Sequence, residues 1–371
     1  MEPTRRGVLS IAASAIFAGC AAPITTRESA DTTQSTSSSP TVAVENASIG
    51  IDSGGYADLY EATVPAVAQI ETTDRTGRGQ GSGFLIDPAD VDGADDRLLV
   101  TNDHVIPEDA DINVTFHEGA WYEGTLVGRD PYSDLAVVRI DSVPDDAVSL
   151  SLVDRVPPIG AAVIAIGAPL DLPETITQGV ISGRNRSLPG PLGYSIADTV
   201  QTDAALNPGN SGGPLLTTDG RVAGVVSATS GENIGFAISA ALARRVLPAL
   251  ATDGDYDHSQ LGIRSVPVDP PVAELNELPD TRGVMVVEVP DDGPSAGILQ
   301  GAPESDTIDG TEYPIGGDVI RQLDDVPIVD QSSLSRYLAL ETSPGDRVDV
   351  AVRRDGEEVV ETVTLGRRPD P

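Results

Sequence analysis

The sequence is poor in the residues that build covalent cross-links and metal centres. It contains a single cysteine, so no disulfide can form within one chain and a cysteine-rich zinc site is excluded. Its three histidines, His104, His117 and His258, lack the spacing of metal ligands. No glycine-rich phosphate-binding loop is present in the sequence either. We therefore expect no metal and no cofactor.

Lysine is absent altogether, and the charge is strongly one-sided. All 23 basic residues are arginines, and they stand against 58 aspartates and glutamates, which gives a net charge of −35. Binding of nucleic acid or another bare polyanion is therefore not expected. Carboxylates keep a surface hydrated in concentrated salt, which also screens their mutual repulsion. We interpret the composition as salt adaptation, as in a haloarchaeon; the alternative is an ordinary acidic exported protein.

Few long helical patterns are present, but apolar residues are spread through the whole chain. They make up 39% of the sequence, which is enough for packed cores and excludes a wholly disordered acidic protein. The 38 glycines and 29 prolines favour strands and turns. A length of 371 residues fits two or three domains.

The N-terminus has the features of an export signal. Arg5 and Arg6 precede an apolar run at residues 7–19 that is too short to span a bilayer, a pattern typical of the twin-arginine route. Cys20 follows this run as in a lipoprotein cleavage box, so we expect it to be lipidated. The alternative is an uncleaved anchor with a chance cysteine.

Processing before that cysteine would remove residues 1–19 as a signal peptide. Residues 20–52, rich in threonine and serine, are then expected to form a disordered tether. The mature protein would be lipid-anchored at the extracellular face of the cell membrane.

Short apolar runs punctuated by glycine begin after the tether. They predict strands at residues 66–70, 83–86, 98–100, 112–116, 135–140 and 162–166. Many short strands at this spacing are typical of an all-β barrel or sandwich. Residues 240–250 predict one short amphipathic helix.

Three polar segments in this region carry His104, Asp134 and Ser211, in that order. Amide hydrolysis by acyl transfer needs a nucleophilic hydroxyl, a base of near-neutral pKa and a carboxylate that orients the base, and these residue types supply all three. The glycine-rich turn can direct backbone N–H groups of Gly209, Asn210 and Ser211 toward a developing oxyanion. Taken singly, each segment has an ordinary structural explanation: a packed or exposed histidine, a turn cap, or a hairpin.

The flanks of these segments connect them to a known family. The matching stretches are residues 79–86, 101–105, 130–140, 165–170, 177–182, 209–215 and 233–238, and the stretch 202–215 is highly specific. With them, the sequence strongly resembles the HtrA family of trypsin-like serine proteases with a C-terminal PDZ domain. The resemblance implies a mainly β fold, with a double β-barrel protease domain at residues 53–252 and an α+β PDZ domain at residues 258–368.

The resemblance also suggests the substrate pocket. Ala205, six residues before the nucleophile, would lie at the pocket base beside Leu206, with Ile234 in the wall. Because no carboxylate lies at that base, we expect cleavage after small or medium aliphatic residues such as valine or alanine. Asp103 departs from the asparagine or alanine usual in the family, and its charge is expected to raise the pKa of His104.

In the second domain, Leu261, Gly262 and Ile263 occupy the position of the PDZ carboxylate-binding loop. Such a domain binds peptide C-termini by adding the peptide as a strand. Residues 300–315 form an insertion that many PDZ domains of the family lack. The alternative is a small β domain that only braces the protease.

Two functions follow from these observations. The first is an exported HtrA-type serine endopeptidase that cleaves unfolded or damaged proteins through an acyl-enzyme, with a homotrimer expected by resemblance alone. The second is a protein-binding or chaperone-like module whose protease site is latent. The intact trio of His104, Asp134 and Ser211 argues against a decayed site, but a latent site would contain the same residues.

Overall fold

The structure, a computed structural model, describes residues 55–75, 77–91, 97–167, 175–190, 194–229 and 234–370. The predicted signal peptide, Cys20 and the tether lie outside these described residues. Within the described part of the chain, no helix combines the length and the apolar character that crossing a membrane requires.

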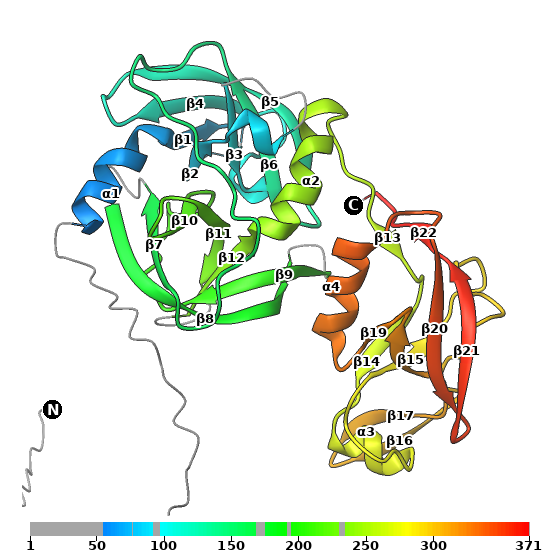
Figure 1. Ribbon diagram of the computed structural model, residues 1–371. Coiled ribbons are helices and arrows are strands. Elements are labelled where there is room, and N and C mark those ends of the chain that lie inside the picture. Colours follow the sequence, from blue (N-terminus) through cyan, green and yellow to red (C-terminus); the bar gives the residue numbers. More distant parts are fainter. Residues whose placement is uncertain are drawn as a thin grey trace, which may run out of the picture. The chain divides into compact units, whose positions relative to one another are not determined.

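Six antiparallel strands close the first barrel (Figure 1). Helix α1 (Gly55–Thr63) and a short 3-10 turn precede it. The strands follow one another around the barrel in the order β1 (Val67–Thr73), β2 (Arg78–Leu85), β3 (Leu98–Thr101), β6 (Leu135–Ile140), β5 (Trp121–Asp130) and β4 (Asp111–Phe116).

A second closed barrel follows in the chain, and its six strands are also antiparallel. Their order is β7 (Ala162–Gly167), β8 (Thr175–Pro189), β9 (Ser195–Thr202), β12 (Gly235–Ser239), β11 (Val222–Thr229) and β10 (Pro214–Thr217). Helix α2 (Ala240–Thr252) comes next, and the Ser239 side chain caps it by accepting from the N–H of Leu242.

Some of the apolar runs, including those in β6 and β7, become strands that are buried on both faces. In β6, Leu135 belongs to the core shared by both barrels and α2, whereas Ala136 points into the first barrel. In β7, Ile164 belongs to the shared core and Val163 points into the second barrel. Because side chains alternate along a strand, only a continuous apolar run can fill two cores at once. The shared core fixes the two barrels against each other.

The C-terminal domain is built on a separate sheet with the strand order β14-β15-β18-β20-β21, and β19 pairs with β18. The elements are β13 (Ser259–Gln260), β14 (Arg264–Pro267), α3 (Pro270–Leu275), β15 (Val284–Glu288), β18 (Val319–Leu323), β19 (Val326–Pro327), α4 (Gln331–Glu341), β20 (Arg347–Arg354), β21 (Glu357–Thr364) and β22 (Gly366–Arg367). The short strands β13 and β22 pair with each other. The first and last segments of this domain therefore lie side by side.

The predicted insertion is a hairpin of its own, formed by β16 (Glu304–Ile308) and β17 (Thr311–Ile315). Asn276, at the end of α3, attaches it to the domain. Its side chain donates to the carbonyl of Pro314 at 3.0 Å and accepts from the N–H of Gly316 at 2.7 Å. The insertion is thus an ordered addition to the domain.

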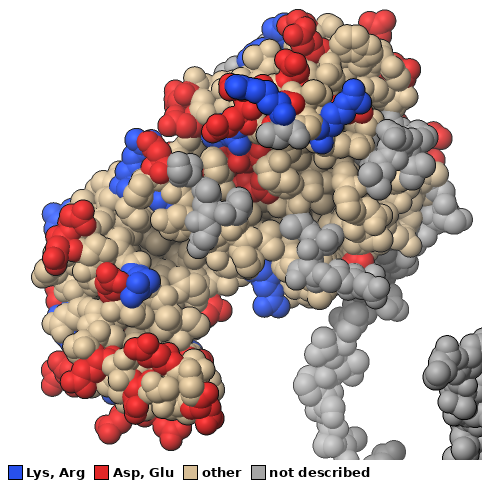
Figure 2. All heavy atoms as spheres, turned by 180° about the vertical axis from the view of Figure 1, so that it is seen from behind, with Lys and Arg blue, Asp and Glu red and all other residues tan. Residues whose placement is uncertain are grey.

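The mainly β architecture, with two closed six-stranded barrels before an α+β domain, confirms the predicted fold class. Figure 2 shows the carboxylates of the face in view in several separate groups, some of them with arginines beside them.

Candidate active site

His104 lies in a 3-10 turn (Asp103–Val105) that directly follows β3. Two buried polar side chains directly before the turn hold it in place. Thr101 donates to the carbonyl of Ser82 at 2.7 Å, and Asn102 donates to the carbonyl of Asp134 at 2.9 Å. The first barrel thus positions the histidine beside the turn that carries the aspartate.

Asp134 is placed in the β5–β6 turn with a left-handed φ of +56°. Its buried carboxylate accepts hydrogen bonds from His104 Nδ1, at 2.8 and 2.9 Å to its two oxygens, and from the His104 N–H at 3.1 Å. A further donor is the hydroxyl of Ser227, at 2.7 Å. A carboxylate held in this way fixes the histidine tautomer that has its proton on Nδ1 and leaves Nε2 free to accept a proton.

The electrostatics of the site favour a basic imidazole. Burial by itself lowers the pKa of His104, but the hydrogen bond and charge of Asp134 outweigh it, and the charge of Asp103 adds to them. The pKa of His104 is therefore raised above its ordinary value, and the contribution of Asp103 has the predicted sign. Burial also raises the pKa of Asp103, although Arg129, whose Nε lies 2.6 Å from its carboxylate, opposes this. His104 is a stronger proton acceptor here than a free imidazole.

Ser211 occupies the glycine-rich turn before β10. Its hydroxyl donates to the backbone carbonyl of Ser227 at 2.9 Å, and the hydrogen bonds between described residues include none from Ser211 to His104. Ser227 therefore connects the trio, because its carbonyl accepts from Ser211 and its hydroxyl donates to Asp134. Proton transfer from Ser211 to His104 requires the hydroxyl to leave the Ser227 carbonyl.

The turn needs glycine beside the nucleophile. Gly212 has φ +86°, and a Cβ atom there would lie 2.1 Å from the carbonyl oxygen of Ser82. Ser82 also holds the start of this turn, since its hydroxyl donates to the carbonyl of Gly209 at 2.6 Å. Substitution at Gly212 would push the nucleophile turn away from the first barrel.

The N–H groups of the three predicted oxyanion donors differ in whether they already donate a backbone hydrogen bond. The N–H of Asn210 donates to the carbonyl of Asn207 at 3.0 Å within the turn. None of the backbone hydrogen bonds between described residues is donated by Gly209 or Ser211. Among the described residues, these two N–H groups therefore have no backbone acceptor.

Of the three predicted pocket residues, Ala205 and Leu206 follow β9, and Ile234 directly precedes β12, which pairs with β9. Leu206 packs so closely against Gly235, the residue after Ile234, that a Cβ atom on Gly235 would lie 2.4 Å from the Leu206 Cδ1 atom. The side chains of Ala205 and Ile234 are exposed. Residues 168–174, 191–193 and 230–233, which flank this region in the chain, lie outside the described residues.

The loop at Leu261, Gly262 and Ile263 has a shape that requires its glycine. Gly262 has φ +65°, and a Cβ atom there would lie 2.3 Å from a ring carbon of Pro294. The buried hydroxyl of Ser295 donates to the carbonyl of Leu261 at 2.6 Å, and Ile263 packs on the domain core. β14 begins directly after this loop and stands at the end of the strand order, so its outer edge has no strand partner among the described strands.

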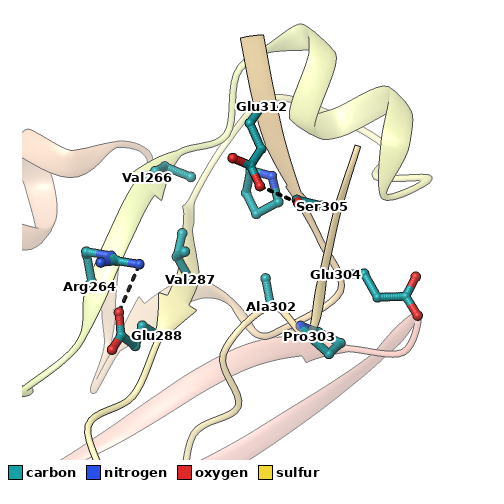
Figure 3. Close-up of a pocket in the computed structure, with 10 residues that line it drawn as sticks. Arg264, Val266, Val287, Glu288, Ala302, Pro303, Glu304, Ser305 and Glu312 are labelled. Carbon is teal, nitrogen blue, oxygen red and sulfur yellow. Dashed lines mark hydrogen bonds and ion pairs between the residues drawn. The ribbon is translucent and has the colours of Figure 1, made fainter. Parts of the chain in front are cut away.

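A separate cavity of about 900 Å³ lies in the same domain, between β14–β15 and the inserted hairpin (Figure 3). Arg264 and Val266 line it, and Arg264 pairs with Glu288 at 2.9 Å. Ser265 lies between them in β14 and bonds to Gln331 of α4 at 3.3 Å. Because side chains alternate along a strand, the cavity is on the face of β14 opposite to α4. Part of its lining comes from the predicted insertion at residues 300–315, and none of the predicted site residues lines it.

One cluster of potential metal ligands occurs among the described residues. Ligand atoms of His117, Glu118 and Asp146 lie within 4.8 Å of one another. The imidazole Nε2 is 3.1 Å from Asp146, whereas Nδ1 is 3.4 Å from Glu118, so the two carboxylates contact opposite nitrogens of one ring. The arrangement is that of a surface ion pair, and sequence spacing gave no sign of it because Asp146 is distant in the chain.

Ser227 is the functional residue that sequence reasoning missed. It lies in β11, within a run of apolar and small residues. A single serine in such a strand has no motif of its own, and only the fold brings its hydroxyl to Asp134.

Two family models match the chain in sequence order. The first describes a trypsin-like peptidase domain and covers residues 81–225; the second describes a PDZ domain and covers residues 259–365. The first match contains the trio of His104, Asp134 and Ser211, and the second contains the loop at Gly262.

Curated relatives are similar over most of the chain. A probable periplasmic DegP-like serine endoprotease from Chlamydia pneumoniae is 35% identical over 300 residues, which cover 78% of this chain and 55% of the relative. A protein with the same description from Halomonas elongata is 34% identical over 313 residues, which cover 83% and 60%. The chain thus spans little more than half the length of these relatives.

Solved structures match nearly over their full length. The HtrA-type protease AlgW with tripeptide has a TM-score of 0.65 and 33% identity, and the match covers 85% of this chain and 98% of that one. The serine endoprotease from Yersinia pestis has a TM-score of 0.59 and 30% identity, with the same coverage.

Proposed function

This chain belongs to the HtrA family of trypsin-like serine proteases with a C-terminal PDZ domain, and we propose that it works as a serine endopeptidase on unfolded or damaged proteins. The observation that carries this proposal is the arrangement around Asp134. One buried carboxylate orients His104, and Ser227 connects that carboxylate to Ser211. The arrangement contains the nucleophile, base and orienting carboxylate that acyl transfer from a peptide needs.

The proposed reaction proceeds in two proton-transfer cycles. Ser211 Oγ attacks the scissile carbonyl carbon while His104 Nε2 takes its proton, and Asp134 stabilises the resulting imidazolium. The carbonyl oxygen, now negatively charged, accepts from the N–H groups of Gly209 and Ser211. His104 then protonates the departing amine, which leaves an acyl-enzyme on Ser211. Water, deprotonated by His104, hydrolyses this ester and restores the serine.

Substrate selection is proposed to involve both domains. A pocket at Ala205, Leu206 and Ile234 without a carboxylate would accept small or medium aliphatic side chains. In the PDZ domain, the glycine-dependent loop at Gly262 and the free edge of β14 support binding of peptide C-termini by strand addition.

We further propose that the protein is exported, since curated relatives are named periplasmic proteases. The twin arginines support the twin-arginine route, and Cys20 supports a lipid anchor that holds the tether, the protease domain and the PDZ domain at the outer face of the membrane. A single acyl chain binds a bilayer only marginally, so stable attachment implies a double modification. A homotrimer rests on family resemblance alone, and salt adaptation rests on the net charge of −35.

A second candidate function is favoured by one feature of the site. The Ser211 hydroxyl is bonded to the Ser227 carbonyl, with no bond to His104 among the described residues. A resting enzyme in this arrangement would be latent and would act as a binding or chaperone-like module until a ligand changes the turn.

Incubation with unfolded casein at about 1 M KCl, where the screening length is about 3 Å, tests these two functions. The wild-type protein should fragment casein, and Ser211→Ala should not. Equal fragmentation by both proteins would disprove the role of Ser211. Protection of casein from aggregation by both proteins, without any cleavage, would favour the second function.

A further inference from the structure

We propose that His258 and Arg368, which lie far from the catalytic trio in sequence, are positioning residues for Asp134. Together with Pro369 they form a clamp on the turn at residues 130–134, and we call this group the C-terminal clamp. The inference rests on the proposed protease function, because it assigns these residues a part in orienting His104. It gives residues 368 and 369 a role in the protease site.

The clamp is assembled by pairing the two ends of the C-terminal domain. β13 and β22 are antiparallel, with Ser259 opposite Arg367. The pairing continues one step further, because the N–H of Arg368 donates to the carbonyl of His258 at 2.8 Å. His258 and Arg368, at the two ends of the domain, are thereby held side by side against the first barrel.

His258 acts on the turn through the buried carboxylate of Asp130. The exposed fractions are 3% for Asp130 and 8% for His258, and His258 Nε2 lies 2.7 Å from the carboxylate. The same carboxylate accepts from the N–H of Tyr132 at 3.1 Å, and from both the N–H and the hydroxyl of Ser133. Ser133 is the residue directly before Asp134. A shift of the Asp130 carboxylate therefore moves the backbone that carries the catalytic aspartate.

Arg368 and Pro369 hold the middle of the turn. The guanidinium carbon of Arg368 lies 4.6 Å from the ring centre of Tyr132 and 4.8 Å from that of Tyr194. The Tyr132 hydroxyl donates to the carbonyl of Pro369 at 2.7 Å. The rings of Tyr132 and His258 also meet edge to face, with centres 5.5 Å apart. Apart from the contact with Tyr194, each of these contacts joins the turn to a residue of the clamp.

The turn needs external support for two reasons. Asp134 has φ +56°, a left-handed conformation that is unfavourable for most non-glycine residues and persists when its surroundings impose it. The turn also faces a cavity of about 630 Å³ that is lined by His104, Tyr132, His258 and Arg368. Space beside the turn would let it relax once the clamp is removed.

Several charged groups surround the two histidines. Asp134 and Asp103 face His104, and Arg129 pairs with Asp103. Asp130 faces His258 from the turn, and Tyr132 and Tyr256 pack on its ring. Because Asp134 is the group that raises the pKa of His104 most, displacing it should lower this pKa.

The test compares variants of the full-length protein with a short peptide substrate. His258→Ala should lower kcat about tenfold, equivalent to about 1.4 kcal/mol in the barrier, with KM almost unchanged. The acid limb of its activity profile should move to lower pH. His258→Gln, which keeps a side-chain N–H donor, should recover most of the lost rate. His117→Ala, at the surface ion pair, is the matched control and should behave as wild type.

Arg368→Met is the second variant, because it keeps an aliphatic stem between the two tyrosines and loses only the cation. It should lower kcat in the same direction as His258→Ala, and it carries the test if His258→Ala does not fold in thermal melts. Unchanged kcat and acid limb in folded variants would overturn the proposal. So would a joint change in kcat and KM with an unmoved pH profile, because that indicates a general structural role.

Histidine NMR separates this proposal from the proposed function. In full-length protein with Ser211→Ala, the ring signals of three histidines can be followed through a pH titration without any turnover. Adding His258→Ala should lower the pKa of His104 and weaken the low-field signal of its Nδ1–H. An unchanged His104 titration would refute the clamp even if the protease is active. A lowered pKa would support the clamp even if no substrate is cleaved.

Discussion

Replacement of Ser227 by alanine removes one donor from the Asp134 carboxylate and leaves the rest of the proposed site in place. The hydroxyl lies 2.7 Å from Asp134 Oδ2, and the exposed fractions are 4% for Ser227 and 3% for Asp134. Water therefore has little access to replace the missing donor. The backbone carbonyl that accepts from Ser211 is unaffected by the substitution.

The expected size of the effect follows from the kind of bond removed. A hydrogen bond to a charged group contributes about 1.5–3 kcal/mol, and each 1.4 kcal/mol in the barrier changes the rate about tenfold. If most of this hydrogen-bond free energy is lost in the transition state, kcat/KM falls about 10- to 100-fold. The loss should stay well below the roughly 10⁴-fold cost of removing the orienting carboxylate function, because the two His104 donors still hold Asp134.

The assay is cleavage of a short peptide under kcat/KM conditions, alongside thermal melts. Ser295→Ala is a matched control, because it also removes a buried hydroxyl donor, 2.6 Å from the Leu261 carbonyl in the PDZ domain. Both variants should lose some stability, but only Ser227→Ala should show the lower kcat/KM for peptide cleavage. A kcat/KM within twofold of wild type for Ser227→Ala, or an equal loss in both variants, would refute the reasoning.

Four further predictions address the base, the nucleophile turn, the surface and the anchor. Asp103→Asn removes a negative charge that raises the pKa of His104, so this pKa should fall and the acid limb of kcat/KM should move to lower pH; a limb that stays or rises contradicts the assignment. Gly212→Ala should abolish cleavage, because φ is +86° and the new Cβ would lie 2.1 Å from the carbonyl oxygen of Ser82. Gly220→Ala is the control, because φ is +81° but the new Cβ would make only an ordinary 3.4 Å contact; it should keep activity and lose only stability. Retained cleavage in Gly212→Ala would exclude the described turn. The melting temperature and the activity should rise from about 0.1 M to above about 1 M KCl, as the screening length drops from about 10 Å to 3 Å, and a flat or falling series would remove the salt-adapted interpretation. Cys20→Ser should release the protein from membrane fractions, and unchanged attachment with normal signal processing would exclude the lipid anchor.

The strands of the barrels were predictable because they carry local signals, whereas their closure into two barrels was expected only from the family resemblance. In the run at residues 135–138 every side chain is apolar, which indicates a strand with two buried faces, and the structure distributes these side chains between two cores. The candidate trio was equally accessible, since glycine and polar residues around His104, Asp134 and Ser211 form distinctive segments.

The rest depends on contacts between residues far apart in the chain. The Tyr132 hydroxyl meets a carbonyl 237 positions away, and His258 meets a carboxylate 128 positions away. None of these residues belongs to a sequence motif, so no local pattern could predict the two contacts. The inserted segment is a similar case, because its acidic, turn-rich sequence does not predict a particular structure. In the fold it is a hairpin held by Asn276.

The central claim is that Ser211 is the nucleophile of a working protease, activated by His104. The most direct measurement is reaction of the full-length protein with a fluorophosphonate in concentrated KCl, followed by mass spectrometry of its peptides and assay of the remaining casein cleavage. The proposed function predicts that the label bonds covalently to Ser211, that activity falls in proportion to labelling, and that His104→Ala abolishes both. Labelling of another residue with loss of activity, or full casein cleavage after Ser211 is completely labelled, would contradict it.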